Sequence, residues 1–159
     1  MDPRLRGDDA AWDRQRVATE SLKMTPAGIL ETVLYARNLA AAEAFYHDTL
    51  GMEPFAKAAG RHLFYRCGNQ VLLIFNPEAT RVPPAPGPLP VPRHGMEGEG
   101  HVCFRASAAD IDAWREQLEG KGVAIEADFE WPGGGRSIYF RDPAGNCLEF
   151  AEPRIWKLA

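Results

Sequence analysis

The sequence has little cysteine, no long hydrophobic run and no excess of positive charge. Three cysteines in 159 residues are an odd number, widely spaced, unlike the dense pattern of a disulfide-stabilised secreted domain. Apolar runs such as Val71–Phe75 have the length of a β-strand and are too short to span a bilayer. A net charge of −4 gives no positive field for nucleic acid or acidic membranes. These absences predict a cytoplasmic protein that binds neither nucleic acid nor membrane.

Length and composition indicate a single globular domain with short flanking segments. A chain that is 45% hydrophobic and 25% charged can bury a core of its own at this length. Residues 1–27 are polar and lack the apolar stretch of a secretory signal, so we expect an N-terminal extension that is partly disordered or helical. Residues 28–153 carry the periodic patterns, and residues 154–159 are a C-terminal tail.

Two similar series of strand and helix patterns divide this domain into two halves, residues 28–76 and 100–153. Alternating and β-branched residues predict strands, and apolar residues spaced three or four apart predict helices. The expected elements are a strand at 29–35, a helix at 39–50 and strands at 62–66 and 70–75, then a strand at 101–106, a helix at 107–120 and strands at 123–129, 137–140 and 147–150.

The stretch between the halves, residues 77–99, is rich in proline. Seven of the thirteen prolines lie there, which predicts an extended and irregular connection. Such a connection can cover a binding cleft as a lid or can serve as a passive linker.

Each half therefore corresponds to one βαβββ module, and the repeat predicts an α+β fold. We expect the two modules to form a curved mixed sheet around a cleft, with the helices outside. Matching the halves places Glu31 opposite His101, Ile74 opposite Glu149 and Tyr65 opposite Tyr139. Residues at equivalent positions would then converge on the cleft.

The last strand contains an unusual carboxylate. Asp142–Asn146 has the composition of a tight turn, and Glu149 follows between Leu148 and Phe150. A carboxylate in an apolar strand has to be paired, solvated or bound to a cation.

The segments Glu31–Gly51, Gly100–Phe104 and Tyr139–Glu149 together resemble the vicinal oxygen chelate superfamily. This superfamily includes glyoxalase I, extradiol dioxygenases, fosfomycin-resistance thiol transferases, methylmalonyl-CoA epimerase and bleomycin-resistance proteins. The resemblance covers about residues 28–153 and implies the two-module fold. Because members commonly dimerise, sometimes completing the site across subunits, it also implies a homodimer.

The resemblance also implies a metal site, since ligands in the superfamily come from the first and last strand of each module. Carried over, they are Glu31, His101 and Glu149, whereas Ile74 cannot bind a metal. One imidazole and two carboxylates suit Mn²⁺, Fe²⁺, Ni²⁺, Zn²⁺ or Mg²⁺. The implied function is a glyoxalase-like metalloenzyme with lyase or isomerase chemistry, in which the metal stabilises an enolate or other oxyanion of a small oxygenated metabolite.

Further residues are expected near the cleft. Tyr139 lies ten residues before Glu149, an offset at which extradiol dioxygenases carry a pocket tyrosine, so we expect both residues to take part in catalysis. Alternation along the strands adds side chains that would line the cleft and contact substrate, and two arginines could bind a substrate carboxylate or phosphate. These substrate-binding candidates are Tyr35, Arg37, Cys103, Arg136 and Cys147.

Other interpretations remain open on the sequence alone. Glu149 could pair with Arg105 or Arg136, and the histidine and tyrosine could be ordinary strand residues. A metal-free protein that binds a small molecule, similar to bleomycin-resistance proteins, is the main alternative function. An extradiol dioxygenase is a third, although its usual iron site has two histidines and one carboxylate.

Overall fold

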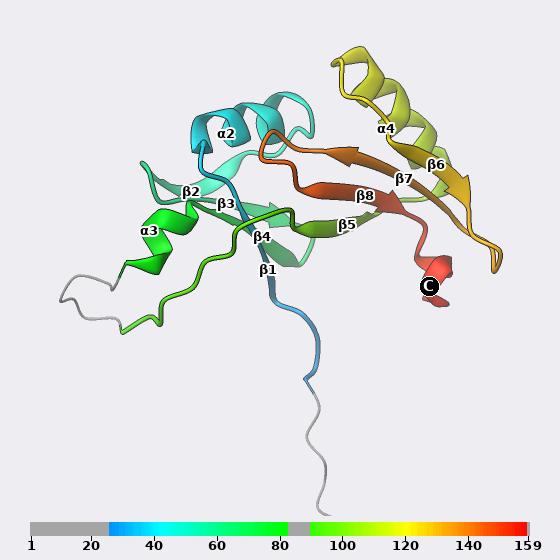
Figure 1. Cartoon of the computed structure of the whole chain (residues 1–159). Helices are drawn as coiled ribbons and strands as arrows, with labels where there is room; N and C mark the ends of the chain where they lie inside the picture. The colour runs from blue at the N-terminus through cyan, green and yellow to red at the C-terminus, as the bar shows by residue number, and fades with distance from the viewer. Residues whose placement is uncertain (1–25, 83–89, 159) are drawn as a thin grey trace, which may run out of the picture.

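The computed structural model describes residues 26–82 and 90–158, and these form two βαβββ modules of an α+β fold (Figure 1). The expected helix and extension within residues 1–25 lie outside the described residues. Module one consists of β1 (Glu31–Tyr35), α2 (Leu39–Asp48), β2 (Pro54–Ala58), β3 (His62–Cys67), β4 (Gln70–Phe75) and α3 (Pro77–Arg81). Module two consists of β5 (His101–Arg105), α4 (Ala108–Gly120), β6 (Ala127–Glu130), β7 (Arg136–Arg141), β8 (Cys147–Ala151) and the 3₁₀ helix η1 (Pro153–Trp156).

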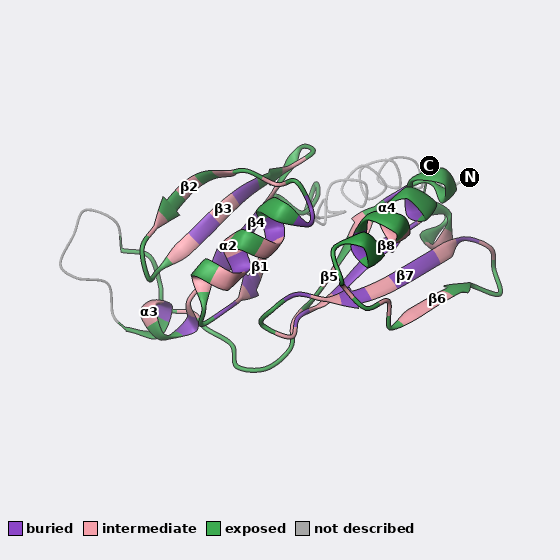
Figure 2. Ribbon diagram, turned by 90° about the horizontal axis from the view of Figure 1, so that it is seen from above, coloured by how far each residue is buried: buried purple, intermediate pink, exposed green. Residues whose placement is uncertain are grey.

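Each module has its own four-stranded mixed sheet. The strand orders are β1-β4-β3-β2 and β5-β8-β7-β6, so the two sheets have the same topology. The first strand of each module runs parallel to the last, and the remaining pairs are antiparallel. The predicted repeat is therefore confirmed, and the edge strands β1 and β5 face each other where the modules meet (Figure 2).

Both long helices begin at the caps that the sequence indicates. The Asn38 side chain accepts a hydrogen bond from the backbone N–H of Ala41 at the start of α2. At the start of α4, Ser107 and Asp110 form a reciprocal capping box. Each helix turns an apolar stripe toward its own sheet, and Tyr46 of α2 and Ile111 of α4 are fully buried there.

The core lies between each helix and the sheet face that it covers. In β3 and β4, alternate residues point to this face and are almost completely buried, as are alternate residues of β7 and β8 (Figure 2). These residues are Leu63, Tyr65, Leu72 and Ile74 in module one and Ile138, Phe140, Leu148 and Phe150 in module two. The opposite sheet faces remain available for a binding site.

Three sequence-based assignments need correction. Strand β2 was not placed by the sequence pattern, since Pro54–Ala58 is short and contains lysine and alanine. The connection expected to be irregular begins with the helix α3, in which Pro77 occupies the first turn and Asn76 caps it. Strand β6 begins at Ala127 rather than at residue 123.

Buried polar contacts join the modules at the turn between β7 and β8. The hydroxyl of Tyr46 donates to Asp142 Oδ2 at 3.0 Å. Asn146, which is fully buried, donates to the carbonyl of Tyr35 at 3.1 Å and accepts from the N–H of Gly100 at 2.8 Å. A Cβ on Gly100 would lie 2.9 Å from Leu34, so the close approach there requires glycine.

No helix in the described part of the chain is both long and apolar enough to cross a membrane.

Candidate metal and ligand site

Five of the predicted site residues lie on one face of the sheet of module two, opposite α4. The register pairs His101 of β5 with Cys147 of β8, and Cys103 with Glu149. Strand β7 pairs Tyr139 directly with Glu149. Because side chains of paired residues point to the same face of a sheet, these five side chains form one surface centred on Glu149.

The two candidate ligands on this surface lie close together. Nε2 of His101 is 3.3 Å from Oε2 of Glu149, and Nδ1 of His101 is 3.0 Å from the carbonyl oxygen of Cys147. A carbonyl can only accept a hydrogen bond, so Nδ1 carries a proton and donates it. A neutral His101 would therefore direct the lone pair of Nε2 toward a carboxylate oxygen, which requires a proton or a cation between the two atoms.

One carboxylate oxygen of Glu149 has no hydrogen-bond partner among residues 26–82 and 90–158. The residue is only 5% exposed, and its Oε1 is buried without a hydrogen bond from any described residue. An unpaired buried carboxylate oxygen is costly, whereas a bound cation would satisfy it. Together with the tautomer of His101, this arrangement fits half of a divalent metal site.

Tyr139 and Cys103 keep their protons at neutral pH. Burial, followed by a hydrogen bond to Glu149 and the charge of that residue, raises the pKa of Tyr139 to about 12. Burial and then the charge of Glu149 raise the pKa of the Cys103 thiol to about 12 as well. Tyr139 can therefore act as a hydrogen-bond donor, and Cys103 is unsuited to be a nucleophile.

Glu31 does not join His101 and Glu149 within one chain. Among residues 26–82 and 90–158, no three His, Cys, Asp or Glu side chains come close enough together to hold a metal ion. Glu31 is exposed at the start of the edge strand β1. The expected convergence of equivalent residues from the two modules is therefore not seen in the single chain.

The strand registers also correct the matching of the two modules. Val33 pairs with Leu73, as Cys103 pairs with Glu149, so the counterpart of Glu149 is Leu73 and not Ile74. By the same comparison, the counterpart of Tyr139 is Phe64 rather than Tyr65. A shift of one residue moves a side chain to the other face of the sheet, and Ile74 in fact belongs to the core.

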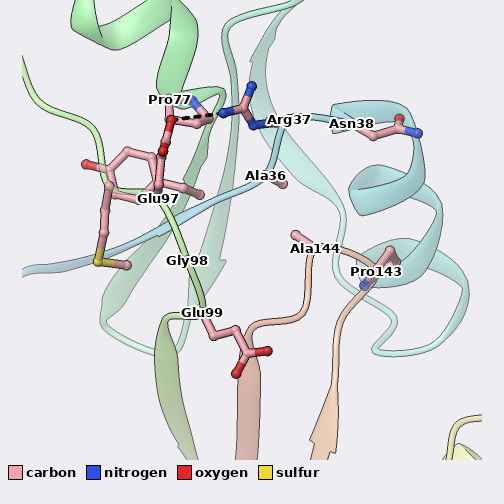
Figure 3. Close-up of a pocket in the computed structure, with 11 residues that line it drawn as sticks. Ala36, Arg37, Asn38, Pro77, Glu97, Gly98, Glu99, Pro143 and Ala144 are labelled. Carbon is pink, nitrogen blue, oxygen red and sulfur yellow. Dashed lines mark hydrogen bonds and ion pairs between the residues drawn. The ribbon is translucent and has the colours of Figure 1, made fainter.

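Tyr35 and Arg37 lie in a different pocket, of about 390 Å³, at the end of β1. Figure 3 shows Arg37 reaching Glu97 of the connection, with a distance of 2.9 Å between Nη2 and Oε1. Arg37 also pairs with Glu78, so both carboxylates compete with any anionic ligand for this arginine. The hydroxyl of Tyr35 lies 2.8 Å from Nδ1 of His94.

Arg136 lies on the face of its sheet opposite to Tyr139 and Glu149. Side chains alternate along β7, so those of Arg136 and Tyr139 point to opposite faces. The guanidinium of Arg136 donates hydrogen bonds to both carboxylate oxygens of Asp128, each at 2.7 Å. A further hydrogen bond of 2.5 Å joins it to Asp112 of α4. The structure thus gives Arg136 a place in packing α4 and β6, so we do not retain it as a substrate-binding residue.

Sequence reasoning did not identify Phe129 as a residue that borders the site. Phe129 of β6 stacks on Tyr139, and Trp131 contacts Phe129. A signal was present, because Phe129 precedes a glycine-rich hairpin turn that returns the chain to Tyr139, but the register of that hairpin could not be read from the sequence.

Comparison with known proteins agrees with this fold. Residues 28–150 match the family model described as the Glyoxalase/Bleomycin resistance protein/Dioxygenase superfamily. The chain is a member of this superfamily. A search of curated proteins found no match.

Solved structures have the same architecture. A lactoylglutathione lyase from Agrobacterium tumefaciens is 43% identical, with a TM-score of 0.80, and the match covers 85% of this chain and 100% of that one. A glyoxalase/bleomycin resistance protein/dioxygenase from Nocardioides is 22% identical, with a TM-score of 0.63 and coverage of 89% and 90%. An integron cassette protein from a Halifax Harbour sewage outfall is also 22% identical, with a TM-score of 0.63 and coverage of 80% and 99%. The latter two show the fold alone.

Proposed function

We propose that the protein is a glyoxalase-like metalloenzyme with lyase or isomerase chemistry, acting on a small metabolite with two adjacent oxygens. The observation that carries the proposal is the His101–Glu149 pair, in which a lone pair on Nε2 faces a carboxylate whose second oxygen is buried and has no partner in the described part of the chain. The 43% identical structure from Agrobacterium tumefaciens is named as a lactoylglutathione lyase, which supports an enzyme of this kind.

His101 and Glu149 would supply two of the metal ligands, and Glu31 of a second copy of the chain would supply the third. Glu31 cannot do so within its own chain as described above, and its exposed position on an edge strand leaves it available to a partner. This proposal makes the protein a homodimer with two equivalent sites. A bound Mn²⁺, Fe²⁺, Ni²⁺, Zn²⁺ or Mg²⁺ would act as a Lewis acid toward the substrate oxygens.

The protein's own groups would handle the proton and the orientation of the substrate. A carboxylate displaced from the metal, such as that of Glu149, would accept the proton from a substrate carbon. Tyr139, with its pKa raised to about 12, would stay protonated and donate a hydrogen bond to a substrate oxygen. Cys103 and Cys147 would line the floor of the site beside Glu149.

Metal analysis tests this proposal directly. Protein purified without a metal-affinity column should contain about one divalent metal ion per chain by mass spectrometry, as two equivalent sites per dimer require. Added Mn²⁺ or Ni²⁺ should raise the melting temperature of metal-depleted protein. In the Glu149→Gln variant, the metal affinity should fall by about 100-fold or more. Formation of lactoylglutathione is the first activity to assay. A protein that contains no metal and shows no activity would contradict the enzyme proposal.

A metal-free binding protein is the second candidate function. Leu73 occupies the place in module one that Glu149 occupies in module two, so β4 offers no ligand to the cleft. An unchanged melting temperature with every metal, together with tight binding of an organic ligand, would favour this second function.

A further inference from the structure

A row of four rings crosses the face of module two that carries Glu149. The ring of His101 stacks on Tyr139 with centroids 6.3 Å apart and planes 21° from parallel. Tyr139 stacks on Phe129 at 5.9 Å and 8°, and Phe129 meets Trp131 edge to face at 5.0 Å. The row therefore begins at a candidate metal ligand and leads outward to the edge strand β6.

The outer two rings are held in place yet remain accessible. The indole N–H of Trp131 donates to the hydroxyl of Ser137 at 2.9 Å, which fixes the ring over the sheet. Phe129 pairs with Ser137 in the strand register, so both residues lie on the face of Tyr139. Phe129 is nevertheless 40% exposed and Trp131 39% exposed. Two large rings fixed beside a polar site and open to solvent are well suited to bind a flat apolar group.

We propose that Phe129 and Trp131 form a subsite for a planar, aromatic or conjugated group of the substrate, one that extends from the carbon atoms bearing the two oxygens. The inference deepens the proposed function, because that function places the oxygens at His101 and Glu149. A group attached next to those oxygens would pass Tyr139 and reach the stacked rings. The rings would discriminate between substrates by stacking and by burial of apolar surface.

Module one carries rings on its equivalent face as well. His62 stacks on Phe64 with centroids 4.0 Å apart, and Phe75 meets Phe64 edge to face at 5.4 Å. Phe64 is the residue that corresponds to Tyr139 in the repeat. The proposed dimer brings this face of one copy toward Glu149 of the other, so the second wall of the cleft would also be aromatic.

Two small ligands, mandelate and lactate, can test the ring subsite independently of the metal site. Mandelate and lactate present the same adjacent hydroxyl and carboxylate oxygens, and they differ in carrying a phenyl or a methyl group. In the Mn²⁺-loaded protein, calorimetry should show that mandelate binds about tenfold more tightly than lactate, because stacking favours the phenyl group. The Phe129→Ala and Trp131→Ala variants should each reduce this preference to about threefold or less.

Trp156→Ala provides a matched control, since Trp156 is 74% exposed and does not belong to the row. This variant should keep the full preference for mandelate. Equal affinities for the two ligands in the parent protein would overturn the ring subsite, as would an unchanged preference in the Phe129→Ala/Trp131→Ala double variant. A double variant that becomes monomeric in sedimentation, with its preference intact, would show instead that the rings are contacts between copies.

The metal site and the ring subsite can be tested separately. Titration with Mn²⁺ alone tests the metal site and does not depend on the rings. Saturation-transfer NMR on metal-free protein reports contact with the phenyl protons of mandelate and does not depend on the metal. If the protein binds no Mn²⁺ but still contacts the phenyl protons of mandelate, only the proposed function is overturned. If it binds Mn²⁺ but has equal affinities for mandelate and lactate, only the ring subsite is overturned.

Discussion

Leu73 of β4 occupies in module one the position that Glu149 of β8 occupies in module two. Both pair with the middle residue of the first strand of their module, Val33 and Cys103 respectively. The next residue, Ile74, points to the opposite face and is fully buried under α2. The two halves of the repeat therefore differ on the cleft face, where module one has leucine and module two has glutamate. The core residue Ile74 is not part of this difference.

A matched pair of variants tests this register. Leu73→Gln places an amide on the cleft face, where Leu73 is 7% exposed, and should cost less of the unfolding free energy than the same change at Ile74, which is fully buried. Ile74→Gln buries the same amide in the core and should cost about 3 kcal/mol or more. Chemical denaturation of both variants gives the comparison. Equal losses, or a larger loss for Leu73→Gln, would contradict the register.

Mixing two inactive variants tests whether the site is shared between copies. Glu31→Gln and Glu149→Gln should each abolish tight Mn²⁺ binding. In a mixed dimer with shared sites, one site carries both substitutions and the other carries neither. After unfolding and refolding an equal mixture, roughly a quarter of the sites should recover Mn²⁺ binding, as random pairing in a twofold dimer predicts.

Refolding each variant separately provides the control for that mixture. Neither variant alone should recover Mn²⁺ binding. If Glu31 completed the site of its own chain, the mixture would contain no intact site and would bind no more metal than its components.

Arg136 should prove to be a stabilising residue without a role in substrate binding. Its hydrogen bonds lower the pKa of the Asp128 carboxyl from its ordinary value of 3.8. A lowered pKa means that the charged carboxylate stabilises the fold above about pH 4 and that this contribution is lost as the pH falls through the folded-state pKa. Asp128→Asn should cost about 1–2 kcal/mol at pH 7, and the difference from the parent protein should shrink below pH 4.

Thermal unfolding between pH 2.5 and 7 measures that difference. Arg136→Gln should lower the melting temperature at pH 7 to a similar extent and leave the KM for substrate unchanged. A raised KM in a variant with normal stability would restore Arg136 to the substrate site.

Asn146 should be the most sensitive residue of the turn that joins the modules. Asn146→Ala leaves the N–H of Gly100 and the carbonyl of Tyr35 without their partner, and it should cost about 2–4 kcal/mol in unfolding free energy. Because Gly100 directly precedes His101, affinity for Mn²⁺ should fall as well. Asn69→Ala, at the exposed turn between β3 and β4, is the control and should change stability by about 0.5 kcal/mol or less.

Local patterns in the sequence determined much of the fold. Asn38, Ser107 and Asp110 mark the helix starts through short-range hydrogen bonds, which depend on residues only a few positions apart. The repeated order of strands and helices indicated both modules, and the resemblance to the superfamily implied that His101, Tyr139 and Glu149 share one site. Helix caps and strand alternation are local properties, so the modules could be recognised without tertiary information.

Only the tertiary structure decided the registers and the distances between modules. The choice between Leu73 and Ile74 depends on backbone hydrogen bonds between strands far apart in the sequence, and an error of one residue reverses the face of the sheet. The same holds for Arg136, which the chain turns toward Asp128 and away from Glu149. The sequence indicated candidate metal ligands, but the pairing of β5 with β8 brings His101 and Glu149 together within module two, and Glu31 of module one does not join them in one chain.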